Sequence, residues 1–217
     1  MEGNKVPKAK RPRIQVRQQE PAVRIKNFDE VPFGYSEEEA VAEADRCLQC
    51  KTPTCIQGCP VNINIKLFIN HIAKRDFRAA INTIKMDNSL PAVCGRVCPQ
   101  EEQCESRCVM LKTKNPINIG SLERFAADWE AKNPGEKAQL PPRKKDKNGN
   151  PIKIAIAGAG PAGLTVAGDL VKMGYTPVVF EAMHIAGGVL VYGIPEFRLP
   201  KSIVQREVDY LKSMGVE

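Results

Sequence analysis

The sequence predicts a multidomain chain in which an all-α domain is followed by the start of an α/β domain. All eight cysteines lie between Cys47 and Cys108, among segments whose apolar residues recur with helical spacing. A glycine-rich turn follows an apolar strand at residues 158–163, as at the opening of a βαβ unit. A segment rich in proline, lysine and asparagine separates these two regions. With 217 residues, of which 42% are apolar, the chain can bury one large core or two modest ones.

The positive charge of the chain is concentrated in two segments that we expect to be solvated. The net charge is +7, whereas residues 1–26 alone carry +6 and residues 132–153 carry +5. We therefore interpret 1–26 as a basic tail and 133–151 as a linker. The helical domain then covers 27–132 and the α/β part covers 152–217. Neither basic segment interleaves aromatic residues with its charges, so we expect no nucleic-acid partner.

The sequence contains neither of two signals that would direct the chain to a membrane or out of the cell. No apolar run approaches the roughly 20 residues of a membrane helix, and no apolar stretch of a secretion signal follows the basic start. We therefore expect a cytoplasmic protein with no membrane partner. Thiols are kept reduced in that compartment, so the clustered cysteines indicate metal binding and not a disulfide framework.

Apolar periodicity predicts five helices in the helical domain. They are expected after Ser36, over 65–72, over 77–84, over 101–109 and over 120–132. Ser36 and Glu39 have the spacing of a capping box, and Asp76 is a suitable N-cap for the third helix. Trp129 shares the apolar face of the fifth helix, so we expect it to pack in the core.

The cysteines form two tightly spaced groups. The groups are Cys47-x2-Cys50-x4-Cys55-x3-Cys59-Pro60 and Cys94-x3-Cys98-x5-Cys104-x3-Cys108, with Pro99 directly after Cys98. Such spacing lets a loop wrap thiolates around a cuboidal iron–sulfur cluster, and the proline turns the chain away so that its cysteine can reach a second cluster. Zinc is the alternative, but only Cys47 and Cys50 form a C-x2-C pair, and His71 and His184 lie at no ligand-like spacing. The spacing favours iron–sulfur clusters.

The start of the α/β part has the pattern of a dinucleotide site. The strand 152–157 runs into Gly158-Ala159-Gly160-Pro161-Ala162-Gly163, in which the second glycine lets a pyrophosphate approach the backbone at a helix N-terminus. A second strand, 176–180, ends at Glu181, whose carboxylate can accept both ribose hydroxyls, and Gly187-Gly188 follows. The alternative is an ordinary βαβ turn without a ligand.

Longer motifs carry a family resemblance. Besides the patterns above, they are Cys94-Gly95-Arg96-Val97-Cys98-Pro99-Gln100-Glu101, Ile117-Asn118-Ile119-Gly120 and Tyr192-Gly193-Ile194-Pro195-Glu196-Phe197-Arg198-Leu199-Pro200-Lys201. In this order they resemble the glutamate synthase small subunit (beta chain) family over nearly the whole chain after the tail. The same module opens dihydropyrimidine dehydrogenase and the large subunit of the NADH-dependent ferredoxin:NADP oxidoreductase. The resemblance implies an all-α domain with two 4Fe-4S clusters, followed by a Rossmann-like FAD-binding domain into which an NAD(P)H domain is inserted.

The resemblance also implies roles for individual residues. One cluster would be held by Cys47, Cys50, Cys55 and Cys108, and the other by Cys59, Cys98, Cys104 and Glu123. Cys94 competes with Glu123 as the last ligand, but by resemblance it is a bystander. FAD would be bound by Ala157, Gly158, Ala159, Gly160, Pro161, Gly163, Glu181, Gly188, Val189 and Arg198. No catalytic residue is expected, because the cofactors carry the chemistry.

The function implied is that of an electron-transfer oxidoreductase subunit. Electrons would pass between NAD(P)H, FAD and the two clusters to a partner, either a glutaminase or synthase large subunit or a small flavoprotein or ferredoxin. The alternatives are the large subunit of a flavin-based ferredoxin:NADP oxidoreductase or sulfide dehydrogenase, a non-catalytic iron–sulfur relay, and a zinc-stabilised nucleic-acid binder. The chain ends at Glu217, where a third strand would begin, so we expect a fragment whose NAD(P)H site lies on the absent part.

Overall fold

The computed structural model describes residues 7–135 and 139–217. They form two compact units: unit 1 comprises 7–27 and 31–134, and unit 2 comprises 28–30, 135 and 139–217. Each unit contains helices and one sheet of two strands. Among the described residues, no helix is long and apolar enough to cross a membrane.

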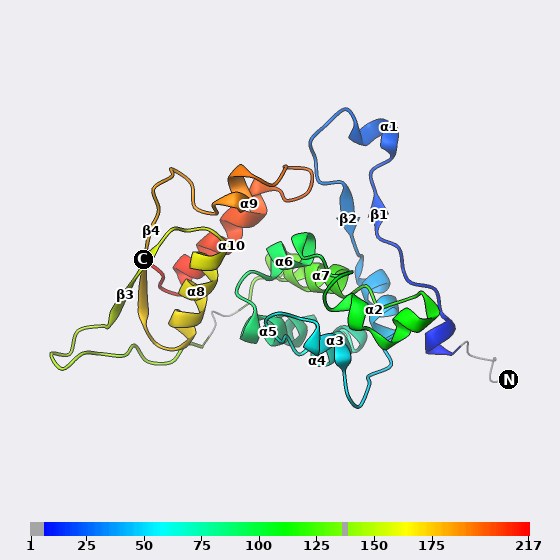
Figure 1. Ribbon diagram of the computed structural model, residues 1–217, viewed down its shortest axis with the longest axis horizontal. Helices are drawn as coiled ribbons and strands as arrows, with labels where there is room; N and C mark the ends of the chain where they lie inside the picture. Colours follow the sequence, from blue (N-terminus) through cyan, green and yellow to red (C-terminus); the bar gives the residue numbers. More distant parts are fainter. Residues whose placement is uncertain (1–6, 136–138) are drawn as a thin grey trace. The chain divides into compact units, whose positions relative to one another are not determined.

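Unit 1 is dominated by helices. Its α-helices are α1 (Pro21–Arg24), α2 (Glu37–Asp45), α3 (Thr54–Gln57), α4 (Ile65–Ala73), α5 (Phe77–Asp87), α6 (Pro91–Val97) and α7 (Ile119–Lys132). Three short 3-10 helices are η1 (Lys8–Lys10), η2 (Glu105–Arg107) and η3 (Val109–Thr113). The strands β1 (Arg17–Gln18) and β2 (Pro32–Gly34) pair antiparallel and stand out from the helices, with α1 beyond them (Figure 1).

Local capping starts the predicted helices where the sequence indicates. The capping box of α2 is confirmed, because Ser36 Oγ accepts from the amide of Glu39 at 3.2 Å and Glu39 Oε2 accepts from the amide of Ser36 at 2.7 Å. Asp76 Oδ1 accepts from the amide of Ala79 at 3.0 Å and caps α5. These caps satisfy amides that have no partner inside the helix.

The core of unit 1 lies where α4, α5 and α7 meet. Phe68, Ile69, Ile72, Ile81, Ile84 and Leu122 are all at most 1% exposed. Phe77 packs edge-on against Phe125 and Trp129, with ring centroids 5.0 and 5.6 Å apart. The expectation that Trp129 is a packing residue is therefore confirmed.

The α-helix predicted over 101–109 does not form. The segment contains turns and the short 3-10 helices η2 and the start of η3. An α-helix would place residues i and i+4 on one face. Here Cys104 lies close to Cys59, whereas Cys108 lies close to Cys55. The chain must turn more tightly than an α-helix to direct these two cysteines to different neighbours.

The basic N-terminal segment is partly built into unit 1 instead of being wholly solvated. The amide of Ile14 donates to Glu43 Oε2 at 2.8 Å, and Glu43 and Arg46 are 0% and 1% exposed. Arg13 forms an ion pair with Glu105 at 2.8 Å. Buried carboxylates need such partners, because an unpaired charge in the interior is costly. These partners come from residues that the sequence pattern assigned to a tail.

Unit 2 begins with a parallel βαβ arrangement. Strands β3 (Lys153–Ala157) and β4 (Thr176–Phe180) pair in parallel, with Lys153 opposite Thr176 and Ala157 opposite Phe180. Helix α8 (Pro161–Lys172) connects them, and α9 (Val189–Tyr192) and α10 (Lys201–Ser213) follow. Apolar residues of α8 and α10 form the core of this unit: Leu164, Ala167, Val171, Val204, Val208 and Leu211.

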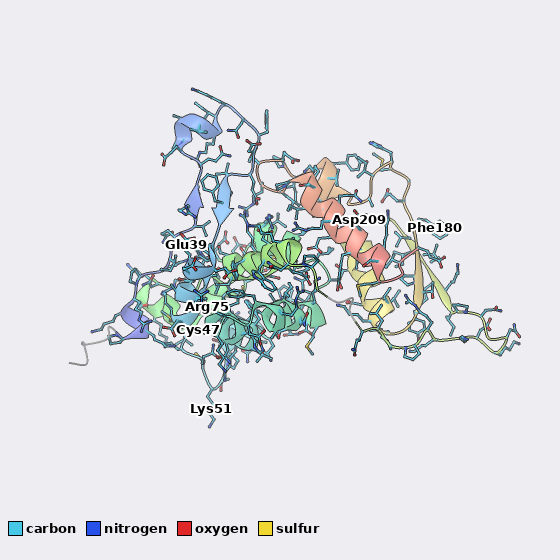
Figure 2. The ribbon with its side chains drawn as sticks, turned by 180° about the vertical axis from the view of Figure 1, so that it is seen from behind. Glu39, Cys47, Lys51, Arg75, Phe180 and Asp209 are labelled. Atoms are coloured by element: carbon cyan, nitrogen blue, oxygen red, sulfur yellow. The ribbon has the colours of Figure 1, made fainter. Side chains whose placement is uncertain are left out.

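The free edge of β4 receives the last residue of the chain. The amide of Val179 donates to the carbonyl of Glu217 at 2.7 Å, and the amide of Glu217 donates to the carbonyl of Pro177 at 3.0 Å. These two hydrogen bonds lie where the sequence predicts a third strand, and among the described residues this sheet consists of β3 and β4. Phe180 at the end of β4 is 62% exposed (Figure 2).

Candidate cofactor sites

Three cysteines of the first group and one of the second line a pocket of unit 1. The pocket encloses about 450 Å³, part of it open to solvent, and four cysteines line it: Cys47, Cys50, Cys55 and Cys108. Its other walls are mostly apolar and include Leu48, Ile65, Ile69, Val109, Ile117 and Ile119. The hydroxyl of Thr54 donates to the carbonyl of Arg107 at 2.5 Å and so joins α3 to η2 beside this pocket. In Figure 2, Lys51 projects outward from the loop after Cys50.

Burial and neighbouring charge raise the pKa of two thiols in this pocket. Burial, together with the negative charges of Cys108 and Cys47, raises the pKa of Cys55 to about 11. Burial also raises the pKa of Cys47, with a contribution from Cys108 and Cys50. Four thiolates so close together are stable only next to compensating positive charge. Four sulfur donors in an apolar pocket therefore fit an iron–sulfur cluster, which binds thiolates.

Two cysteines of the second group, Cys94 and Cys104, lie near Glu123. Burial raises the pKa of Cys104, and the charges of Glu105, Glu123 and Cys59 add to this effect. A hydrogen bond between Cys94 and Cys98 raises the pKa of Cys94 and lowers that of Cys98. Burial and the charge of Glu123 also raise the pKa of Cys94. The structure thus brings Cys94 and Cys104 close to the same carboxylate.

Glu123 is not a surface residue. Its side chain on α7 is 7% exposed, and its Oε1 accepts from Asn88 Nδ2 at 2.7 Å. Asn88 Oδ1 in turn lies 3.6 Å from Cys94 Sγ. Sequence reasoning missed Asn88, which ends α5 and has no periodic signal of its own. Thiols beside a buried carboxylate are donors that suit an iron–sulfur cluster, and Cys94 lies among them.

Gly95 lets α6 approach the helix that carries Glu123. A Cβ atom at this position would lie 2.5 Å from the backbone nitrogen of Arg124, closer than real Cβ contacts. Gly95 lies on α6 between Cys94 and the C-cap Cys98. Close contact of the two helices therefore brings Cys94 toward Glu123.

Neither group resembles a site for a single metal ion. Over residues 7–135 and 139–217, no three His, Cys, Asp or Glu side chains are arranged to hold one ion. Four thiolates on a cuboidal cluster bind different iron atoms, so they need not converge on one point.

The glycine-rich turn of unit 2 is open on one side and packed on the other. A Cβ atom on Gly158 or Gly160 would meet nothing within 4 Å, whereas one on Gly163 would lie 2.0 Å from the carbonyl oxygen of Gly158. Gly158 has a φ of +93°, which glycine adopts without strain. The first two glycines therefore leave room for a ligand at the start of α8, and the third packs the helix on the turn.

Glu181 is bound to this turn. Its Oε2 accepts from the amide of Ala159 at 2.7 Å and its Oε1 from the amide of Met183 at 2.8 Å. The hydrogen bonds from Met183 and Ala159 hold the pKa of this carboxyl below its usual value. A carboxylate has further lone pairs, so it can still accept from ribose hydroxyls.

The structure places the remaining predicted FAD residues around the turn or in nearby exposed segments. The amide of Gly187 donates to the carbonyl of Ala159 at 2.8 Å, which holds Gly188 beside Gly160. Val189 begins α9 and is 58% exposed. Arg198 is exposed between α9 and α10, and among the described residues its guanidinium has no hydrogen-bond or ion-pair partner.

Comparison with known proteins identifies the relatives of this chain. Residues 24–134 match the family model for dihydropyrimidine dehydrogenase domain II, 4Fe-4S cluster. The chain is 40% identical to the NAD-dependent dihydropyrimidine dehydrogenase subunit PreT of Escherichia coli K12 over 189 residues, which is 87% of this chain and 44% of the relative.

Two glutamate synthase (NADPH) small chains are similarly close. Identity is 38% over 194 residues to that of Halomonas elongata and 36% over 196 residues to that of Azospirillum brasilense. These matches cover 89% and 90% of this chain but only 40% of each relative, so the chain spans less than half the length of these proteins. Because its residues 24–134, which contain all eight cysteines, match the family model, the chain belongs to the family of dihydropyrimidine dehydrogenase domain II, 4Fe-4S cluster.

Proposed function

We propose that this chain is the electron-transfer part of an NAD(P)H-dependent flavin and iron–sulfur oxidoreductase subunit. The observation that carries the proposal is the pocket in which Cys47, Cys50, Cys55 and Cys108 come together. The named relatives, one NAD-dependent and two using NADPH, support an oxidoreductase subunit in general.

Two 4Fe-4S clusters would be held by unit 1. The first would be bound by the four thiolates of the pocket, and the second by Cys59, Cys98, Cys104 and Glu123. When bound, each cluster supplies a one-electron carrier. The chain's own contribution is to exclude water, which Ile65, Ile69, Ile117 and Ile119 do at the first pocket. At the second group, Cys94 would stay protonated and orient Cys98 by their hydrogen bond.

Unit 2 would bind FAD as the start of a Rossmann-like domain. The turn from Ala157 to Pro161 would bind the pyrophosphate, supported by the free space over Gly158 and Gly160. Glu181 would accept from the ribose, and Gly188, Val189 and Arg198 would provide further contacts. The NAD(P)H site would lie on a part of the subunit outside this chain.

Electrons would leave toward another redox subunit through unit 1. Leu48 and Val109 line the first pocket and are each 42% exposed, which supports the first cluster as the one nearer the surface of this unit. The partner would be a glutaminase or synthase large subunit, or a small flavoprotein or ferredoxin. We propose a cytoplasmic location, because free thiolate ligands need a reducing compartment.

Spectra and metal content of the full-length subunit, purified without oxygen, test this function. We expect about eight irons per chain together with broad absorbance near 400 nm and flavin bands. Iron without flavin would favour the non-catalytic relay. A colourless protein containing zinc would contradict the proposal.

A further inference from the structure

An ion pair links the N-terminal segment to the second cysteine group. Arg13 Nη2 lies 2.8 Å from Glu105 Oε2, and the two side chains are 24% and 7% exposed. Arg13 precedes the segment 24–134 that matches the family model, and it is 92 positions away from Glu105. Glu105 directly follows Cys104.

The same arginine also contacts the start of α7. Its Nη2 donates to the side-chain Oδ1 of Asn118, the N-cap residue of α7, at 2.7 Å. Glu105 Oε1 accepts from the amide of Gly120, in the first turn of this helix, at 3.3 Å. Arg13 and Glu105 therefore connect the loop of Cys104 to the helix that carries Glu123.

The charge of this pair is balanced only while both residues are present. A carboxylate buried without a cation adds a full negative charge close to Cys104. Negative charge near an iron–sulfur cluster favours its oxidised form and lowers the reduction potential, and an unbalanced positive charge does the opposite. The pair is thus placed to influence the second cluster more than the first.

We propose that Arg13 is a positioning residue for the second cluster, where it neutralises Glu105 and holds Cys104 and Glu123 in register. This inference rests on the proposed function, since it requires a cluster bound by Cys59, Cys98, Cys104 and Glu123. It extends that function to the N-terminal segment. The segment then sets a redox property and does not act only as a tail.

Two substitutions that remove charges of opposite sign test the proposal in the full-length subunit with its cofactors bound. Both cluster potentials are followed by EPR in a redox titration at about pH 8, several units above the ordinary pKa of a carboxyl group. Arg13→Gln should lower the potential of the second cluster, and Glu105→Gln should raise it. The double variant should return close to the wild-type value, because its net charge is again balanced. The first cluster should change little in all three.

Arg17→Gln is the matched control. Arg17 belongs to the same N-terminal segment and pairs with Glu39 at 3.3 Å, but its side chain is 66% exposed. Its loss should leave both potentials unchanged, because an exposed pair is screened by solvent.

The possible results separate this inference from the proposed function. If both clusters are present but their potentials do not move, or move in the same direction in both single variants, the proposed role of Arg13 is overturned. The proposed function is not affected by that result. A wild-type subunit without two clusters would overturn the proposed function as well. If the Arg13→Gln variant loses the second cluster, the iron content of the variant that carries both substitutions, Arg13→Gln and Glu105→Gln, tests charge compensation. Recovery supports charge compensation, and continued loss overturns it.

Discussion

The two units present their candidate sites in different ways. In unit 1 the predicted ligands are half-buried or buried, and Cys104 and Glu123 are only 8% and 7% exposed. In unit 2 the first two glycines of the turn face free space, and the turn is held by its own hydrogen bonds, including 2.7 Å from the amide of Gly158 to the carbonyl of Phe180.

This difference predicts how each unit would depend on the cofactor proposed for it. Thiols that are buried side by side repel one another once ionised, so we expect unit 1 to gain stability from the group that it would bind. The turn of unit 2 is complete without a ligand. We therefore expect substitutions in unit 1 to affect cofactor and fold together, and those at the open glycines of unit 2 to affect the cofactor alone.

The largest effect should follow the loss of a cluster ligand. Cys98→Ser should remove the second cluster and about four irons per chain, because an alcohol is a much weaker ligand than a thiolate. Cys94→Ser is the matched control and should keep both clusters. Equal iron loss in the two variants would make Cys94 a ligand and change the assignment of the second group.

In unit 2, Gly160→Val should abolish FAD binding in the full-length subunit and leave the fold intact. Gly160 has a φ of −74°, which valine can adopt, and a Cβ atom there meets nothing within 4 Å. The branched side chain would instead fill the space of the pyrophosphate. Flavin content and circular dichroism measure the two effects.

Gly163→Val provides the contrasting variant in the same turn. Its Cβ would lie 2.0 Å from the carbonyl oxygen of Gly158, so fold and flavin should be lost together. Wild-type flavin content in the Gly160→Val variant would refute the interpretation that the free space over Gly160 is occupied by the pyrophosphate.

A core substitution in unit 1 tests whether the units are energetically separate. Phe125→Ala should lower the free energy of unfolding of unit 1 by about 3–5 kcal/mol, because Phe125 is 6% exposed and packs on Phe77. Amide hydrogen exchange of α4, α5 and α7 reports on the stability of unit 1, and flavin release reports on unit 2. Phe33→Ala, at a side chain 61% exposed, should change either by less than about 0.5 kcal/mol. Equal destabilisation of both transitions by Phe125→Ala would show that the units unfold as one.

The smallest effect should follow a change of donor at the second cluster. Glu123→Cys should shift one reduction potential and leave the other nearly unchanged, since a thiolate replaces a carboxylate at one iron. Spectroelectrochemistry measures both. Glu130→Cys is the control on the same helix, because Glu130 pairs instead with Lys85 at 2.6 Å. If neither potential responds to Glu123→Cys, Glu123 is not a ligand.

Several features were predictable because they depend on residues close together in the chain. The capping box of Ser36 and Glu39 spans three positions, and the N-cap Asp76 starts α5 as expected. The spacing of the glycines at 158–163 likewise indicated which of them faces open space and which is packed. Such local patterns are visible in sequence, since the partners are fixed by helix and turn geometry.

Other features were decided only by the tertiary structure. The burial of Glu123 beside Asn88 depends on packing that brings together residues 35 positions apart in the chain. The helix expected over 101–109 is replaced by tighter turns. These turns direct Cys104 and Cys108 to different neighbouring cysteines. Arg13 was assigned to a solvated tail, yet it is the partner of the buried Glu105. The sequence by itself determined the cysteine groups, the caps and the glycine turn, because these are local. The pairing of buried charges and the neighbours of each thiol required the folded chain, because long-range contacts bring them together.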